Sequence, residues 1–146
     1  MKRPTKKDKL NEAAAFYNAI RTGSRPRQKR GPISTRPTIP CLAKPEWEVQ
    51  AECVKWLRAR RIFCDPHDCG SGDFGHGYAT YGIKYSGDIH GYLPGGKGFE
   101  IECKTGKGGR LSVGQQKRME GVRAAGGVYL VVHGVEELEY LMKGLI

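Results

Sequence analysis

Residues 98–104, GFEIECK, constrain the fold more than any other segment, because apolar and charged side chains alternate along them. Alternation with a period of two is typical of a β-strand, whose successive side chains point to opposite faces. The apolar face carries Phe99, Ile101 and Cys103, and the charged face carries Glu100, Glu102 and Lys104. The sequence therefore predicts a strand that packs one face on a core and gathers two carboxylates and an ammonium on the other.

Signals on either side of this strand predict a single α/β domain over residues 45–146. Pro45 suits the first position of a helix over residues 45–60, and Ser112 suits the cap of another helix. Periodicity and turn residues predict strands at 61–64, 88–93 and 128–132, helices at 112–127 and 135–143, and a long glycine-rich loop at 65–87. Strands that alternate with helices indicate an α/β layer around a mixed sheet.

Positive charge is concentrated in residues 1–44, which hold twelve Lys and Arg against two acidic residues, while the rest of the chain holds 13 of each sign. Clustered Lys and Arg bind polyanions by releasing counterions from phosphate backbones. Thr5 and Asp8 suit the start of a helix over residues 5–21, and five prolines indicate an extended linker over residues 24–45. The sequence leaves two readings of this basic arm open, a nucleic-acid clamp and a solubilising tail.

The cysteines and apolar segments indicate a protein of the cytoplasm. Five cysteines are an odd number at irregular spacings, which argues for a reducing compartment. No apolar run approaches the roughly 20 residues that cross a bilayer, and no secretory signal is recognisable, so no membrane partner is expected. GSGDFG at residues 70–75 matches a dinucleotide-binding pattern, but no helical periodicity follows it. No small-molecule cofactor is therefore expected.

A segment with two cysteines and a histidine allows a second kind of site. Cys64, His67 and Cys69 in CDPHDC have the spacing of half a zinc site, and His76 would have to join them from a loop. Because the second Cys/His pair is missing, ordinary loop residues are the favoured alternative.

The charged face of strand 98–104 requires something positive between its carboxylates, because like charges held together repel. Asp88, at the start of the neighbouring strand, adds a further carboxylate. Mg²⁺ or Mn²⁺ would suit this place, since hard cations prefer oxygen ligands and are held by one or two carboxylates plus substrate phosphates. We expect Asp88, Glu102 and the Cys103 carbonyl as ligands, with Lys104 beside them. The alternative is a solvent-facing strand with a chance Glu/Lys pattern.

The order of several short motifs is similar to that in a known family. An Asp near a hairpin, E-x-K on its second arm, LS followed by Gln at the start of a helix, and Gly-Gly before an apolar strand occur in that order over residues 87–132. Residues 46–132 resemble the PD-(D/E)xK nucleases, in particular the VRR-NUC domains of phage proteins and DNA-repair nucleases. The resemblance implies a restriction-endonuclease-like core of helix, three strands, helix and strand, followed here by a closing helix.

Positions in the motifs then suggest individual roles. The resemblance implies that Asp88 and Glu102 bind the metal, that Lys104 is the catalytic lysine, and that Gln115 helps to arrange the site. Glu46 corresponds to the acid of the first helix, with Glu48 as the alternative. Further expectations concern three neighbours: Gln116 is the less favoured glutamine, Glu100 is an alternative or supporting ligand, and Gly87 stands where many members have Pro.

Two functions remain open from the sequence. The first is a metal-dependent DNA endonuclease. Lone VRR-NUC domains are similar to Holliday-junction resolvases, which implies branched DNA as the substrate and a homodimer as the active form. The expected location is the cytoplasm of a bacterial host. The expected phosphate contacts are Lys107 and Arg110 near the site and Arg25, Arg27, Lys29 and Arg30 in the arm. The second is a non-catalytic nucleic-acid-binding accessory protein on a nuclease-like scaffold. Asp88, Glu102 and Lys104 together favour catalysis.

Overall fold

A computed structural model describes residues 5–22, 30–73 and 75–146, and the chain divides into two compact units, Met1–Arg30 and Gly31–Ile146. The first unit contains helix α1 (Lys6–Thr22). Its start is capped as predicted, because the Thr5 amide donates to an Asp8 carboxylate oxygen at 2.9 Å and the Asp8 amide donates to Thr5 Oγ1 at 3.2 Å. Within the described ranges, no helix combines the length and apolar character needed to cross a membrane.

A four-stranded mixed sheet is the centre of the second unit. It runs in the order β2 (Phe63–Pro66), β5 (Ile89–Tyr92), β6 (Gly98–Cys103), β8 (Val128–Val132). Strand β5 pairs antiparallel with both β2 and β6, and β8 is parallel to β6. The predicted mixed α/β class is therefore confirmed.

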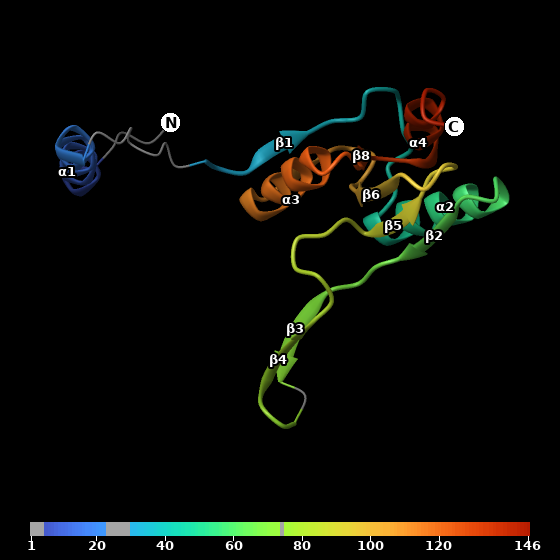
Figure 1. Ribbon diagram of the computed structural model, residues 1–146, viewed down its shortest axis with the longest axis horizontal. Coiled ribbons are helices and arrows are strands. Elements are labelled where there is room, and N and C mark those ends of the chain that lie inside the picture. The colour runs from blue at the N-terminus through green and yellow to red at the C-terminus, as the bar shows by residue number, and fades with distance from the viewer. Residues whose placement is uncertain (1–4, 23–29, 74) are drawn as a thin grey trace. The chain divides into compact units, whose positions relative to one another are not determined.

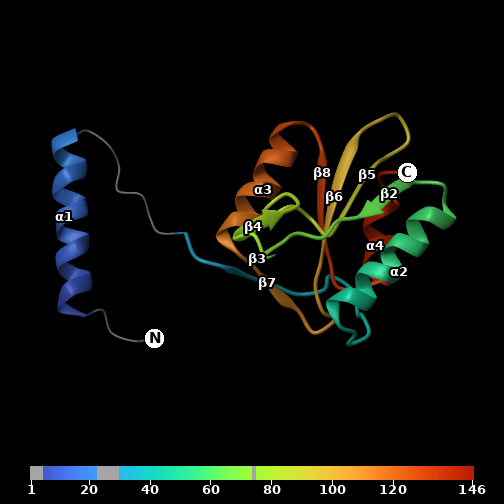
Figure 2. The same ribbon diagram turned by 90° about the horizontal axis from the view of Figure 1, so that it is seen from below.

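Helices cover both faces of the sheet. Helices α2 (Glu46–Ala59) and α4 (Val135–Met142) lie on one side, and α3 (Val113–Ala124) lies on the other (Figure 2). The predicted order of helix, three strands, helix, strand and closing helix is found in α2, β2, β5, β6, α3, β8 and α4, with three further strands inserted. The charged residues of β6 therefore lie beneath α3 rather than in open solvent.

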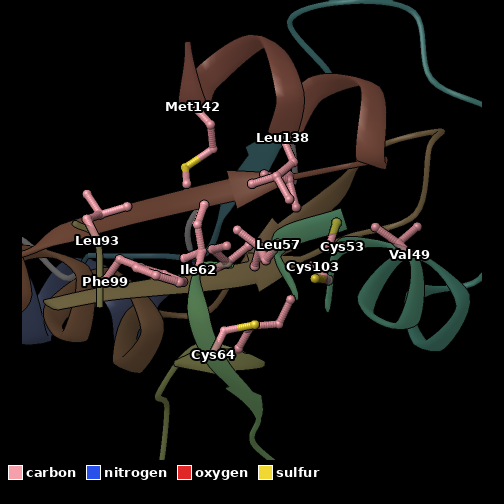
Figure 3. Packing of buried hydrophobic residues seen from close by; sticks show 13 residues of the cluster. Val49, Cys53, Leu57, Ile62, Cys64, Leu93, Phe99, Cys103, Leu138 and Met142 are labelled. Carbon is pink, nitrogen blue, oxygen red and sulfur yellow. The ribbon is translucent and has the colours of Figure 1, made fainter. Parts of the chain in front are cut away.

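The apolar face of β6 builds the core, as its alternation predicts. Phe99, Ile101 and Cys103 are all at most 3% exposed. They pack against α2 and α4, whose buried residues include Val49, Cys53, Leu57, Leu138 and Met142 (Figure 3). Burial of such side chains is the main favourable contribution to folding. One side of β6 is thereby fixed, which determines the direction in which its charged side chains point.

The prediction of a domain beginning at residue 45 differs from the structure, in which residues 31–44 belong to the second unit. Strand β1 (Ile33–Thr35) pairs with β7 (Gly109–Leu111), and neither strand was predicted. The Thr38 amide and hydroxyl donate to Glu137 Oε1 at 2.7 and 2.8 Å. Prolines exclude long regular elements here, but they leave room for a three-residue strand. We call residues 31–44 the strap.

The prediction of a loop over residues 65–87 was partly wrong, because this segment contains a β-hairpin. Strands β3 (Gly70–Asp73) and β4 (Tyr78–Tyr81) pair antiparallel in a separate two-stranded ribbon that extends away from the main sheet (Figure 1). Most of its side chains are exposed or half-buried, so the sequence shows none of the apolar alternation by which strands are recognised. We call residues 67–87 the hairpin segment.

Candidate active site

Glu102, on β6, and Lys104, which directly follows β6, lie side by side in a buried position. Their exposed fractions are 2% and 7%, and Lys104 Nζ donates a hydrogen bond to Glu102 Oε1 at 2.7 Å. Two residues apart on a strand, they share a face, and the backbone position of Lys104 is fixed by its N–H, which donates to the Val132 carbonyl at 2.8 Å. The alternative of a solvent-facing strand is therefore wrong for this face.

Asp88 joins them from the residue before β5. Its Oδ2 accepts a hydrogen bond from the Cys103 amide at 2.7 Å, which brings the carboxylate against the backbone between Glu102 and Lys104. The side chain of Gln50, on α2, donates to the Asp88 carbonyl at 2.7 Å. The backbone of Cys103 thus lies beside Asp88, and the Cys103 carbonyl is the group that was expected as a metal ligand. The Cys103 thiol faces the core.

The first turn of α2 brings a further carboxylate to Lys104. Glu46 Oε1 lies 3.9 Å from Lys104 Nζ, and its side chain is 52% exposed. Glu48 instead pairs with Lys44, whose Nζ lies 3.6 Å from Glu48 Oε1. Of the two acids considered for this helix, only Glu46 is directed to the site.

The first turn of α3 supplies the predicted glutamine. A reciprocal capping box fixes it, because the Gln115 amide donates to Ser112 Oγ at 3.2 Å and the Ser112 amide donates to Gln115 Oε1 at 2.9 Å. Gln115 Nε2 is left to donate to Glu102 Oε1. Gln116 points elsewhere and donates to the carbonyls of Gly31 and Leu111.

Burial and mutual repulsion keep the two central carboxyls from ionising easily. Burial, together with the nearby Asp88 charge, raises the pKa of Glu102 to about 7, against hydrogen bonds from Lys104 and Tyr129 that act to lower it. Burial also raises the pKa of Asp88. Burial acts to lower the pKa of Lys104, but the Glu102 hydrogen bond and the surrounding carboxylates raise it overall. The site therefore holds a protonated lysine beside carboxyls that lack sufficient positive charge.

Glu100 shares the face of Glu102 but has a different environment. Arg118 Nε, on α3, donates to its two oxygens at 3.0 and 3.1 Å, and the Gly87 amide donates to Oε2 at 3.0 Å. Burial acts to raise the pKa of Glu100, yet Arg118 and Gly87 hold it below its ordinary value. Proline at position 87 has no N–H to donate, so glycine here supports Glu100. Glu100 is therefore already neutralised within the protein, and the expectation of a ligand role gains no support from its contacts.

The site also contains a residue that the sequence analysis missed. Tyr129 Oη, on β8, donates to Glu102 Oε2 at 3.4 Å. Tyr129 is directly opposite Glu100 in the register of β8 and β6, so alternation along VYLVV places it on the charged face. That alternation was the available signal, but a continuous apolar run conceals it.

A cleft of about 510 Å³ opens onto these groups. Its lining includes Asp88, Glu102, Ser112 and Gln115, together with residues of the hairpin segment. The carboxylates are thus accessible to a ligand from the side of the hairpin segment.

The zinc alternative finds no support in the arrangement of its residues. Cys64 is buried in the core and Cys69 is exposed. Both ring nitrogens of His67 are engaged, Nδ1 with Ser86 Oγ at 3.0 Å and Nε2 with the Ile83 amide at 3.3 Å. These three residues are not among any group of His, Cys, Asp and Glu side chains that could hold a metal in the described ranges.

The predicted phosphate contacts fall into two sets. Lys107, in the turn after β6, and Arg110, on β7, are both exposed in the second unit. Arg30 is exposed at the end of the first unit, and Arg25, Arg27 and Lys29 lie outside the described residues. DNA binding by these side chains stays a prediction.

Comparison with known proteins yields no relative. No family model, no curated protein and no solved structure matches the chain. The geometry and charge of the site itself are therefore the basis on which a function can be assigned.

Proposed function

We propose that this protein is a divalent-metal-dependent DNA endonuclease that hydrolyses phosphodiester bonds, with Asp88, Glu102 and Lys104 at its centre. One observation carries the proposal. Two buried carboxyls with raised pKa values line a cleft, and a protonated lysine donates a hydrogen bond to one of them. Groups shifted in this way at a cleft are typical of functional sites.

The donor set fits Mg²⁺ or Mn²⁺. Asp88 and Glu102 offer two carboxylates, and the described residues provide no group of three His, Cys, Asp or Glu side chains that would complete a cage. Mg²⁺ typically takes one or two protein carboxylates and fills its remaining positions with water and substrate phosphate. When bound, such a cation supplies positive charge to phosphate oxygens in the transition state. A cation held by Asp88 and Glu102 would offset the repulsion between these two carboxylates.

Lys104 and Glu46 have distinct roles in this proposal. The raised pKa of Lys104 keeps its ammonium charged at neutral pH, so it serves to stabilise negative charge on the phosphate and not to remove a proton. Glu46, half exposed and 3.9 Å from that ammonium, would accept a proton from an attacking water. Gln115 and Tyr129 hold the Glu102 carboxylate in position.

The proposal is tested by cleavage of labelled DNAs by the full chain in Mg²⁺, Mn²⁺ or EDTA. The panel contains linear duplex, single strand, flap and four-way junction. Lys104→Ala should lower metal-dependent cleavage by about 100-fold or more, because it removes charge stabilisation from the transition state. Lys143→Ala, an exposed lysine at the end of α4, is the matched control and should cleave as the wild type.

The outcome also decides between the two functions left open by the sequence. If the wild type binds the panel but cuts nothing under any metal, the endonuclease proposal fails. The non-catalytic nucleic-acid-binding alternative would then be the better account of the basic residues. If Lys104→Ala cuts as fast as the control, cleavage is not performed by this site.

A further inference from the structure

Two tyrosines of the hairpin segment line the same cleft as the central carboxylates. Tyr81 and Tyr85 are 53% and 43% exposed, and the cleft lining includes both of them together with Asp88 and Glu102. The chemistry proposed above uses neither ring. Two aromatic rings that line one cleft beside the central carboxylates offer apolar surface to a ligand bound there.

The backbone of Tyr85 is held in an uncommon conformation. Its φ is +65°, in the left-handed region that residues with a side chain rarely occupy. Its ring packs on Gly114 in the first turn of α3, so closely that a Cβ at position 114 would lie 2.5 Å from a ring carbon. Gly114 precedes Gln115, the residue that donates to Glu102. The ring of Tyr85 is therefore fixed beside the active-site helix by its neighbours, as strained residues at functional sites often are.

Tyr81 is also seated on a glycine. Its ring covers Gly70 on the paired strand, where a Cβ would approach Tyr81 Oη to 2.7 Å. Gly72 and Ala79 form the next pair on the same face of the ribbon. Small residues leave this face flat, with the Tyr81 ring as its only large group in the paired strands.

The base of the hairpin segment is attached directly to the active site. The His67 amide donates to the Asp88 carbonyl at 2.7 Å. The His67 ring bonds Ser86 Oγ and the Ile83 amide, on the two sides of Tyr85. The position of the tyrosines relative to Asp88 is thereby held by several hydrogen bonds.

Charge argues that this segment recognises bases and not phosphates. Residues 67–87 contain two Asp and a single Lys. That lysine, Lys84, places its ammonium 4.9 Å from the centroid of the Tyr85 ring. Attraction to phosphate requires clustered positive charge, whereas aromatic rings stack on bases of any sequence. Inside a continuous duplex the faces of the bases are covered by their neighbours, so a side chain can stack on a base only where the base is unpaired or ends a helix.

We propose that Tyr81 and Tyr85 form a stacking platform for unpaired bases next to the cleavage site. The substrate class is therefore DNA with single-stranded nucleotides at the point of cleavage, such as a flap or a junction, and not continuous duplex. This inference rests on the proposed endonuclease function for the meaning of the site, but the binding that it predicts can be measured without cleavage.

The test is binding of the full chain to labelled single-stranded, flapped and fully paired DNA in EDTA. Tyr85→Gly removes the ring and suits a φ of +65°, Tyr81→Ala removes the other ring, and Tyr85→Trp retains an aromatic face. Tyr140→Ala, 52% exposed on α4, is the control. Each ring-removing variant should weaken single-strand and flap binding by about 5- to 150-fold and duplex binding by less than about twofold. Tyr85→Trp and Tyr140→Ala should bind as the wild type.

The platform is overturned if the ring-removing variants bind flapped DNA as tightly as the wild type, or if they lose duplex binding equally. Cleavage by the same proteins separates this failure from that of the proposed function. Flap cleavage that depends on Lys104 but is unchanged in Tyr81→Ala and Tyr85→Gly retains the endonuclease and removes the platform. Flap binding that depends on the two rings, with no cleavage under any metal, retains the stacking platform and removes the endonuclease.

Discussion

The ammonium of Lys104 lies 2.7 Å from the carboxylate of Glu102, and both side chains are almost completely buried. A single ion pair of this kind does not neutralise the site, because Asp88 contributes a second carboxyl nearby. The pKa of Glu102 is consequently raised to about 7 in spite of the pair. Several measurable properties follow from this excess of acidic groups.

The raised pKa of Glu102 should make the metal-free protein less stable as pH rises from 4.5 towards 7. Below pH 4.5, the ordinary pKa of a glutamate, Glu102 is protonated in both the folded and unfolded chains, whereas between the two values only the folded chain keeps the proton. The expected loss is at most about 3 kcal/mol in the free energy of unfolding. Denaturant unfolding in EDTA across this range measures it, and Glu102→Gln should show a smaller slope. An equal slope in the variant would contradict the assignment to Glu102.

Mg²⁺ should stabilise the protein more at high pH than at low pH. Cation binding requires the ionised carboxylates, so at acid pH it must first displace the proton held by Glu102. The shift in melting temperature on adding Mg²⁺ should therefore be larger at about pH 8 than at about pH 5.5. Asp88→Asn is expected to abolish most of the shift, and a shift independent of pH would argue against binding at these carboxylates.

Glu46 and Glu48 should differ in their effect on catalysis. Glu46 lies near Lys104, whereas Glu48 pairs with Lys44. Glu46→Ala should lower the cleavage rate by about 100-fold or more, as the loss of a proton acceptor does. Glu48→Ala, two residues away on the same helix, should change the cleavage rate by less than about twofold. Glu48 lies outside the site, and its ion pair with Lys44 contributes little to stability because such exposed pairs are weak. The comparison of single-turnover rates is decisive, and equal rates would remove Glu46 from the proposed mechanism.

Arg118 should contribute to folding and not to chemistry. Removing the Arg118 side chain takes away its hydrogen bonds to the buried Glu100 carboxylate. Of the donors described above, the Gly87 amide then remains. Arg118→Ala is expected to cost about 2 kcal/mol in the free energy of unfolding. Lys117→Ala, the adjacent exposed position on α3, should cost almost nothing. Adding Glu100→Gln to Arg118→Ala should restore part of the loss, and a strictly additive double variant would show that the pair is not coupled.

The strap should be required for a stable second unit. A chain of residues 31–146 retains β1 and the Thr38 hydrogen bonds to Glu137, whereas a chain of residues 45–146 leaves the buried Glu137 without those donors. The shorter chain should lose about 2 kcal/mol or more, because unsatisfied buried groups are costly. Denaturant midpoints of the two chains and the full protein provide the measurement. Equal midpoints would show that the strap is dispensable.

Strong local signals explain which elements could be predicted from sequence. The alternation along β6 placed its apolar residues on the core, and Ser112 with Gln115 identified the start of α3. Strands β1, β3, β4 and β7 are three or four residues long and carry mostly exposed or half-buried side chains, so no apolar period marks them. The pairing of β1 with β7 also depends on a partner far away in the sequence, which a local pattern does not contain.

The same reasoning explains which parts of the site were found. Glu102, Lys104 and Asp88 were suggested by the clustering of charge, and the structure brings them together. The separate environment of Glu100 was not predictable, because it depends on Arg118, eighteen residues later on α3. The contact of Tyr129 with Glu102 was hidden within an apolar run, and the position of Tyr85 depends on a backbone conformation that sequence does not reveal for tyrosine.

The hydrogen bonds that hold the strap have a consequence for the exchange of modules between proteins. The excess of basic residues ends near residue 45, so an exchange of the whole basic arm would divide the chain there. The buried pair of His133 and Glu137 is completed by Thr35 and Thr38 of the strap, with His133 Nε2 3.0 Å from Thr35 Oγ1. The junction that preserves these contacts lies between Arg30 and Gly31. A relative with a different arm should therefore keep its own strap and differ only before it.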